Sequence, residues 1–255
     1  MPHTGRKKSF TNFYHVFVRG INHELIFNQI REKQYFKKII KKHLIKHEVE
    51  IYAYCIMSNH AHFLIKSTDV RILSLFMSKI LAEYAKYYNY KKKRNGHVFQ
   101  NRFRSECIED EKYFWNCLKY IHLNPVKAYM TSNPWEYKYS SMRDYKYKKN
   151  EILHNNALDK CSKHFEEWTS FLEYHYSGSS SVFLGMSGEV YQQQKEKAWN
   201  ILEEIQMAEK LEDIKQVLEE PEIRAKYMDE IQCTMHISKR LKKRICNEIK
   251  ETLFQ

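Results

Sequence analysis

Two histidines separated by a single residue, His60 and His62, have the spacing in this chain that most directly suggests chemistry. They begin an apolar run that predicts a β-strand over 60–65, and residues two apart in a strand project from the same face, about 6.5–7 Å apart. Two imidazoles at that separation can bind one divalent metal ion. The other face carries Phe63 and Ile65 and can therefore be buried. The alternative is two unrelated polar residues on a half-exposed strand.

Tyr120 and Asn124 form a second candidate set. They lie in or next to a segment that predicts a helix over 111–123, which Asp110 caps and Pro125 ends. Residues four apart share a helix face, so the phenol and the amide point to the same side. A phenol can act as a nucleophile, and an amide oxygen can bind a hard cation such as Mg²⁺ or Mn²⁺. The alternative is an ordinary amphipathic tyrosine and an asparagine that caps the helix.

The charge distribution favours a nucleic-acid partner for the N-terminal half. The 255 residues include 43 Lys and Arg against 31 Asp and Glu, a net charge of +12. Residues 1–150 hold 29 of these cations against 12 acids, and 15 of the 19 tyrosines, whereas residues 151–255 hold 14 against 19. Cations neutralise phosphates and flat rings stack on bases, which is what binding of single-stranded nucleic acid needs. The alternative is a solvated basic surface with tyrosines in the core.

The composition also excludes several classes of protein. An aromatic content of 15% argues against a disordered chain, and no apolar run is long enough to span a membrane. The six cysteines are scattered with no CxxC pair, which predicts reduced thiols and not a disulfide framework. The first residues are basic and are followed by no apolar stretch, so we expect no secretory signal. The expected location is the cytoplasm, in association with the nucleoid and not with a membrane.

The order of predicted elements in the first 150 residues is that of an α+β fold. Strand and helix patterns alternate in a way that suits a ferredoxin-like antiparallel sheet with helices on one face. Besides the strand and helix already described, the pattern predicts strands over 13–19, 49–56 and 97–104 and helices over 30–47 and 70–90.

The rest of the chain, residues 151–255, is predicted to be a mostly helical accessory region. A Ser- and Gly-rich hinge at 177–181 precedes segments with helical spacing at 188–207, 211–218 and 237–253. The basic, amphipathic stretch 236–246 suggests either a DNA-recognition helix or a packing helix with an exposed basic edge. We slightly favour the packing helix, because this region as a whole is acidic.

Four segments, in this order, resemble the single-tyrosine transposases of the HUH endonuclease superfamily, in which U is a hydrophobic residue. The similarity is greatest to the REP-associated tyrosine transposases. Ala61 stands at the U position between the two histidines. The segments are 14–20 with 26–27, 54–64, 96–103 and 120–128.

This resemblance implies a function for each motif residue. His60 and His62 become ligands of Mg²⁺ or Mn²⁺, Asn124 a third ligand, and Tyr120 the nucleophile. The implied activity is metal-dependent cleavage and strand transfer of single-stranded DNA near hairpins. Attack by the tyrosine leaves a 5′-phosphotyrosine on the protein and a free 3′-hydroxyl on the DNA. The resemblance does not decide between a monomer and a homodimer.

Basic residues close to these motifs are candidate DNA contacts. Each is also a candidate for a solvated surface residue, but together they predict DNA binding that weakens with salt. They are Arg102, Arg104, Lys91, Lys92, Lys93 and Arg94.

Two other functions compete with the transposase. One is a domesticated, non-catalytic protein that binds DNA hairpins, for example as a repressor; the intact set of histidines, tyrosine and asparagine argues against it. The other is a metal-dependent hydrolase that activates water and does not use Tyr120.

Overall fold

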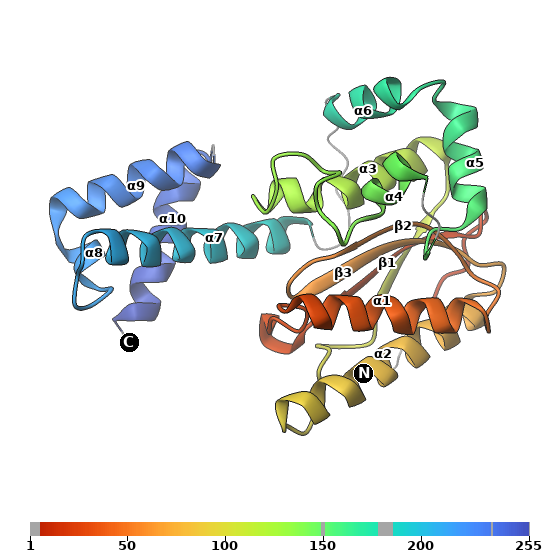
Figure 1. The fold of residues 1–255 in the computed structure, drawn as a ribbon, viewed down its shortest axis with the longest axis horizontal. Helices are drawn as coiled ribbons and strands as arrows, with labels where there is room; N and C mark the ends of the chain where they lie inside the picture. Colours follow the sequence, from red (N-terminus) through yellow and green to blue (C-terminus); the bar gives the residue numbers. More distant parts are fainter. Residues whose placement is uncertain (1–5, 149–150, 178–185, 236, 255) are drawn as a thin grey trace. The chain divides into compact units, whose positions relative to one another are not determined.

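The computed structural model describes residues 6–148, 151–177, 186–235 and 237–254. The chain forms two compact units (Figure 1). The first comprises Met1–Val126 and Met130–Leu184, and the second comprises Lys127–Tyr129 and Gly185–Gln255.

A four-stranded antiparallel sheet in the order β2-β3-β1-β4 is the centre of the first unit (Figure 1). The two central strands are β3 (His60–Lys66) and β1 (Phe13–Arg19), and the edges are β2 (Glu50–Ile56) and β4 (Arg104–Ile108). β1 and β3 are buried over most of their length, because each has a neighbour on both sides.

Helices α1 (Ile30–Leu44) and α2 (Val70–Lys92) cover one face of this sheet (Figure 1). Their apolar stripes pack on alternate strand residues, among them Val16, Phe63 and Ile65, which form one buried cluster. Asp69 caps α2 by accepting a hydrogen bond from the backbone of Arg71. The predicted α+β class with an antiparallel sheet is thereby confirmed.

Helix α3 (Glu111–Lys127) lies on the opposite face of the sheet (Figure 1). Its Phe114 ring contacts the rings of Phe13 and Tyr52, whose side chains project away from α1 and α2. The prediction of helices on one face therefore holds for α1 and α2 but not for α3. As predicted, Asp110 caps α3 by accepting a hydrogen bond from the backbone of Tyr113 (2.7 Å).

Pro125 does not end α3, contrary to the prediction; the helix continues to Lys127. A proline removes one backbone donor, and near a helix end this costs little. The amide nitrogen of Asn124 donates to the carbonyl of Tyr120 (3.1 Å), and the backbone N–H of Met130 donates to that of Pro125 (2.9 Å). These bonds stabilise the last turn around the proline.

The strand predicted over 97–104 is also wrong, because β4 begins only at Arg104. The preceding segment is irregular and touches the sheet through one isolated bridge between Gly20 and Phe99. Its apolar side chains instead fix a loop to the hydrophobic core, in which Val98 and Phe103 are buried.

Three short helices follow α3 in the first unit, so the predicted boundary at residue 150 lies too early. They are α4 (Ser141–Tyr147), α5 (Asn155–His164) and α6 (Trp168–Tyr176). The Tyr54 hydroxyl on β2 donates to Asp144 of α4 (2.5 Å), and Phe171 of α6 is fully buried. Only Ser177 of the predicted hinge is described; 178–181 lie outside the described residues.

The second unit has its own hydrophobic core, in which Tyr227, Ile231 and Ile245 are completely buried. The helices predicted over 188–207 and 237–253 are present, but the segment 211–218 forms only a short helix at its end. A further helix, between 219 and 237, was not predicted. The helices are α7 (Met186–Ala208), α8 (Gln216–Glu219), α9 (Pro221–Met235) and α10 (Lys239–Leu253).

Helix α10 packs as an amphipathic helix with a basic edge. Ile245 and Ile249 face the core, while Lys239, Arg240 and Lys243 are exposed. Ser238 caps its N-terminus through a hydrogen bond from the backbone of Leu241. His236, the first residue of the basic stretch, lies outside the described residues.

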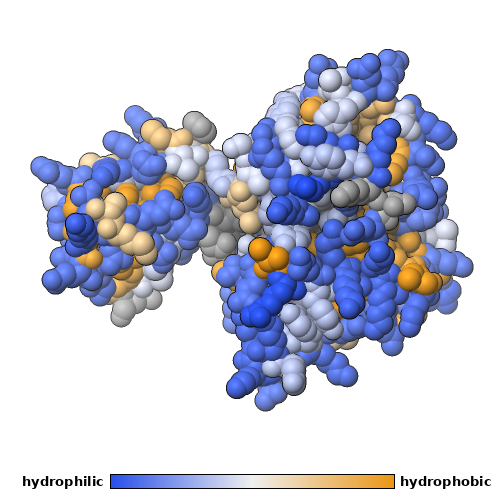
Figure 2. Space-filling model, viewed as in Figure 1, coloured by the Kyte–Doolittle hydropathy of each residue, from blue (hydrophilic) through white to orange (hydrophobic). Residues whose placement is uncertain are grey.

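The surface is mostly hydrophilic in the view of Figure 2, with hydrophobic residues in small scattered groups. Among the described helices, none has the length and apolarity that crossing a membrane requires. All six cysteines are free thiols, as predicted.

Gly20 directly follows β1, at a point where two other backbone segments come close to it. Its N–H donates to the carbonyl of Asn59 (2.8 Å), and a Cβ at this position would overlap the carbonyl oxygen of Glu24, just after the short η1 helix (Ile21–His23). Gly20→Ala should therefore lower the free energy of unfolding by about 1–3 kcal/mol. Urea denaturation measures this loss; an unchanged midpoint would contradict the close approach.

Candidate active site

His60 and His62 project from β3 toward α3, on the side of the sheet away from α1 and α2. Their ring centroids are 5.0 Å apart, and the exposed fractions are 1% for His60 and 0% for His62. The shared face that the His-x-His spacing predicts is therefore present. Phe17, opposite His62 on β1, packs against both rings.

Hydrogen bonds decide which nitrogen each of the two histidines can present to a cation. Nδ1 of His60 lies 2.5 Å from Oδ1 of Asn59, and Nδ1 of His62 lies 3.0 Å from Nε2 of His15. In each ring Nε2 is then the nitrogen able to bind a metal ion. Burial, with His15 as a second cause, lowers the pKa of His62 well below its usual value. His62 is thus a neutral imidazole, the form that binds metals.

Tyr120 of α3 lies against the histidines. The centroid of its ring is 5.2 Å from that of His62 and 5.8 Å from that of His15, and both contacts are edge-to-face. Tyr120 is only 3% exposed. The structure therefore joins the His-x-His strand and the tyrosine helix, which are separated by about sixty residues in the sequence, at one place.

Asn124, one helical turn beyond Tyr120, is also buried. Its Nδ2 donates to the Tyr120 carbonyl, so Oδ1 is the side-chain atom that can bind a cation. Two imidazole nitrogens and an amide oxygen suit Mn²⁺ or Mg²⁺ if phosphate and water complete the coordination. In the described part of the chain, no three His, Cys, Asp or Glu side chains form a metal site by themselves.

His15 and Glu106 belong to the same cluster, although the sequence alone indicated neither of them. Opposite residues of an antiparallel pair share a face. His15 is paired with Leu64 on β3 and with Glu106 on β4, which places both side chains on the face of His62. The alternation of polar and apolar residues in β1 hinted at this, but the register between the strands is not visible in the sequence.

Two arginines lie on the same face of the sheet. Arg104, one of the predicted DNA contacts, is opposite Phe17 and therefore in one row with His62; it is exposed. Arg19, which was not predicted, is opposite His60, and its Nε donates to Gln100 (2.8 Å). Arg102 is exposed just before β4.

The other predicted contacts, Lys91 to Arg94, lie at the end of α2, on the opposite side of the sheet from Tyr120. Three of them are ion-paired within the protein: Lys91 and Lys92 with Glu32, and Arg94 with Glu24. The structure does not bring these four residues to the histidines. Lys93 is exposed, next to Tyr90, which is 89% exposed.

A second pair of buried histidines fixes α3 from behind. Nδ1 of His122 lies 2.9 Å from Nε2 of His175 on α6, and Nε2 of His122 lies 2.8 Å from the hydroxyl of Ser141 on α4. Nδ1 of His175 donates to the carbonyl of Phe171 (2.7 Å). Both rings are then neutral with assigned tautomers, and α3 is linked to both α4 and α6. His122 therefore has a structural role.

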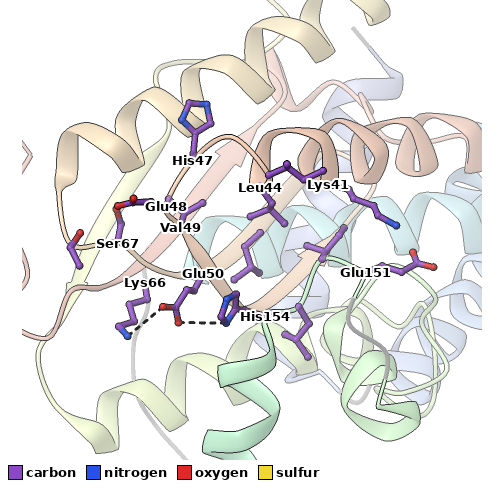
Figure 3. Close-up of a pocket in the computed structure, with 15 residues that line it drawn as sticks. Lys41, Leu44, His47, Glu48, Val49, Glu50, Lys66, Ser67, Glu151 and His154 are labelled. Atoms are coloured by element: carbon purple, nitrogen blue, oxygen red, sulfur yellow. Dashed lines mark ion pairs between the residues drawn. The ribbon is translucent and has the colours of Figure 1, made fainter.

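The hollow in Figure 3 is remote from this cluster. It has a volume of about 590 Å³ and lies at the end of the sheet where β3 finishes, whereas His60 is at the start of β3. Within it Glu50 forms ion pairs with Lys66 (3.5 Å) and His154 (3.7 Å). These three groups neutralise one another in part, and we assign the hollow no function.

Part of the chain is similar to a known family of transposases. Residues 8–124 match the family described as IS200-like transposases, and this segment includes both histidines, Tyr120 and Asn124. A solved structure of a REP-associated tyrosine transposase bound to a REP hairpin is 17% identical, covers 72% of this chain and 96% of that chain, and has a TM-score of 0.49. No curated protein matches the chain. The match to the transposase family over residues 8–124 confirms the resemblance predicted from the sequence for this part of the chain.

The buried His122–His175 pair should make the stability of the protein depend on pH. Burial lowers the pKa of His175 to about 4, so the unfolded chain takes up this proton first. Burial of neutral His175 therefore contributes its full stabilisation above the unfolded pKa of about 6.5. As the pH falls from 7 to 5, the free energy of unfolding should decrease by about 2 kcal/mol. Urea unfolding should show a smaller loss for His175→Gln, which keeps an acceptor for His122. An equal pH dependence in both proteins would contradict the assignment.

Proposed function

We propose that the protein is a metal-dependent, single-strand-specific DNA endonuclease and strand transferase in which Tyr120 is the nucleophile. The observation that supports this most is the contact between Tyr120 on α3 and His62 on β3, at 5.2 Å between ring centroids. A protein that only binds DNA needs no phenol beside a pair of buried imidazoles.

In this proposal each side chain has one role. His60, His62 and Asn124 would hold the cation, which would supply positive charge to offset that of the phosphate. The hydroxyl of Tyr120 attacks phosphorus and loses its proton to solvent, while the bond from phosphorus to the 3′-oxygen breaks and that oxygen takes up a proton from solvent. The products are a 5′-phosphotyrosine and a free 3′-hydroxyl. The 3′-hydroxyl of another strand can reverse the step and join the new ends without ATP.

The burial of the cluster adds a condition. Tyr120, His60 and His62 are each at most 3% exposed, so a DNA phosphate reaches them only after neighbouring groups move. The exposed Arg104 shares their face of the sheet and is suited to bind a phosphate before that movement. We propose that Arg104, with Arg102 beside it, contacts the strand next to the cleaved bond.

A second DNA contact is proposed at the end of α2. Tyr90 is a nearly fully exposed ring with Lys86 and Lys93 exposed beside it, a combination that suits a stacked base and its phosphates. Lys91, Lys92 and Arg94 contribute less in this proposal, since Glu32 and Glu24 already neutralise them. The basic edge of α10 is proposed as a further phosphate contact, and a hairpin as the DNA structure that is bound.

Formation of a covalent protein–DNA adduct tests the proposed catalysis. The protein is mixed with Mn²⁺ and single-stranded DNA from the flanks of its own gene, and the products are separated on a denaturing gel. A slowly migrating protein–DNA species should form, and it should be absent with Tyr120→Phe or with a chelator.

Tyr145→Phe is the matched control: it removes the hydroxyl that donates to the Tyr52 carbonyl (2.7 Å), keeps the buried ring, and should leave the adduct intact. Binding without adduct or cleavage would favour the hairpin-binding alternative. Cleavage that survives Tyr120→Phe would favour the hydrolase that activates water.

The α2 contact predicts that Tyr90→Ala weakens binding of single-stranded DNA by about tenfold, while Tyr90→Phe, which keeps the ring, retains it. Fluorescence anisotropy with a labelled oligonucleotide at fixed salt measures both. Equal affinity of Tyr90→Ala and the unmodified protein would exclude a stacking role for this ring.

A further inference from the structure

Three histidines meet at the candidate site, although only two have the spacing of a metal-binding pair. The following inference rests on the proposed function. We propose that His15 is a positioning residue, which holds His62 in the tautomer and orientation that present Nε2 to the cation. Glu106, on the other side of His15, favours this arrangement. His15 would then touch neither metal nor DNA.

The contact between the two rings is close and rigid. Nε2 of His15 lies 3.0 Å from Nδ1 of His62, and the rings are nearly parallel, with an interplanar angle of 16°. Both side chains are fully buried. His15 is in the middle of β1, which pairs with β3 on one side and β4 on the other, so its backbone is fixed by hydrogen bonds along both edges.

The positions of the protons follow from the role of His62. A neutral imidazole that offers the Nε2 lone pair to a cation carries its proton on Nδ1, which must donate. Nε2 of His15 is the acceptor, so the proton of His15 is on its Nδ1. That nitrogen lies 4.0 Å from Oε2 of Glu106, and the carboxylate favours a proton at this position.

The opposite arrangement would remove the metal site. If Nε2 of His15 donated to Nδ1 of His62, the proton of His62 would be on Nε2, where it blocks a cation. Glu106 opposes this arrangement, because Nδ1 of His15 would then turn a lone pair toward the carboxylate. A carboxylate and a histidine in series therefore select the metal-binding tautomer, the general way in which outer residues tune metal ligands.

Two substitutions of His15 separate this role from simple packing. His15→Leu removes the acceptor, whereas His15→Gln can place an amide oxygen near the position of Nε2. His43→Leu is the matched control, because His43 is a mostly buried histidine of α1 that binds Glu83 (2.9 Å), away from the cluster.

The first readout is Mn²⁺ affinity, measured by electron paramagnetic resonance on the full chain without DNA. His15→Leu should bind Mn²⁺ at least about tenfold more weakly. His15→Gln should recover most of the affinity, and His43→Leu should equal the unmodified protein. Unchanged affinity in His15→Leu, in a protein that does bind Mn²⁺, would overturn the inference and leave the proposed function standing.

The second readout needs no metal. The ¹⁵N chemical shifts of His62 should report the Nδ1–H tautomer in the unmodified protein and in His15→Gln, and a shift toward Nε2–H in His15→Leu. If the unmodified protein binds no Mn²⁺, the proposed metal site fails, and the tautomer still tests His15 separately. An Nε2–H tautomer of His62 in the unmodified protein would overturn the role of His15, and so would a variant His15→Leu that keeps Nδ1–H.

Discussion

The burial of imidazole rings between the sheet and α3 is the constraint on which the rest of the site depends. A buried polar nitrogen must have a hydrogen-bond partner, and a charged ring is costly there. One nitrogen of each metal-facing ring has such a partner: Asn59 for His60 (2.5 Å) and His15 for His62 (3.0 Å). On the far side of α3, His175 and Ser141 do the same for His122. The helix that carries Tyr120 is thus held between two sets of buried histidines.

The sheet separates packing from chemistry. One face is covered by α1 and α2 and is almost wholly apolar, with Val16, Phe63 and Ile65 in its core. The other face carries the histidines, with Arg19 and Arg104 toward one end. Because side chains alternate along a strand, the same residues of β1 and β3 that anchor the core also determine the positions of His15, His60 and His62.

Local patterns in the sequence predicted most of the elements and the central pair of motifs. The spacing of His60 and His62, and of Tyr120 and Asn124, depends only on strand and helix periodicity, so their faces were predictable. His15 and Glu106 were not, because their place depends on the register between β1, β3 and β4. The same reason explains Lys91 and Arg94: their partners Glu32 and Glu24 are about sixty to seventy residues away in the sequence. Pro125 does not end the helix because a proline near a helix end removes only one backbone donor, a small cost that the sequence rule for helix ends does not include.

The most direct test of the central claim is to find the atom to which DNA becomes attached. After reaction with Mn²⁺ and single-stranded DNA, the protein is digested with a nuclease and trypsin, and the peptides are examined by mass spectrometry. Cleavage after Lys119 and Lys127 releases a peptide that begins with Tyr120 and contains no other tyrosine. The account predicts a nucleotide, linked through its 5′-phosphate, on this peptide. An unmodified peptide together with cleaved DNA, or a nucleotide on another residue, would contradict it.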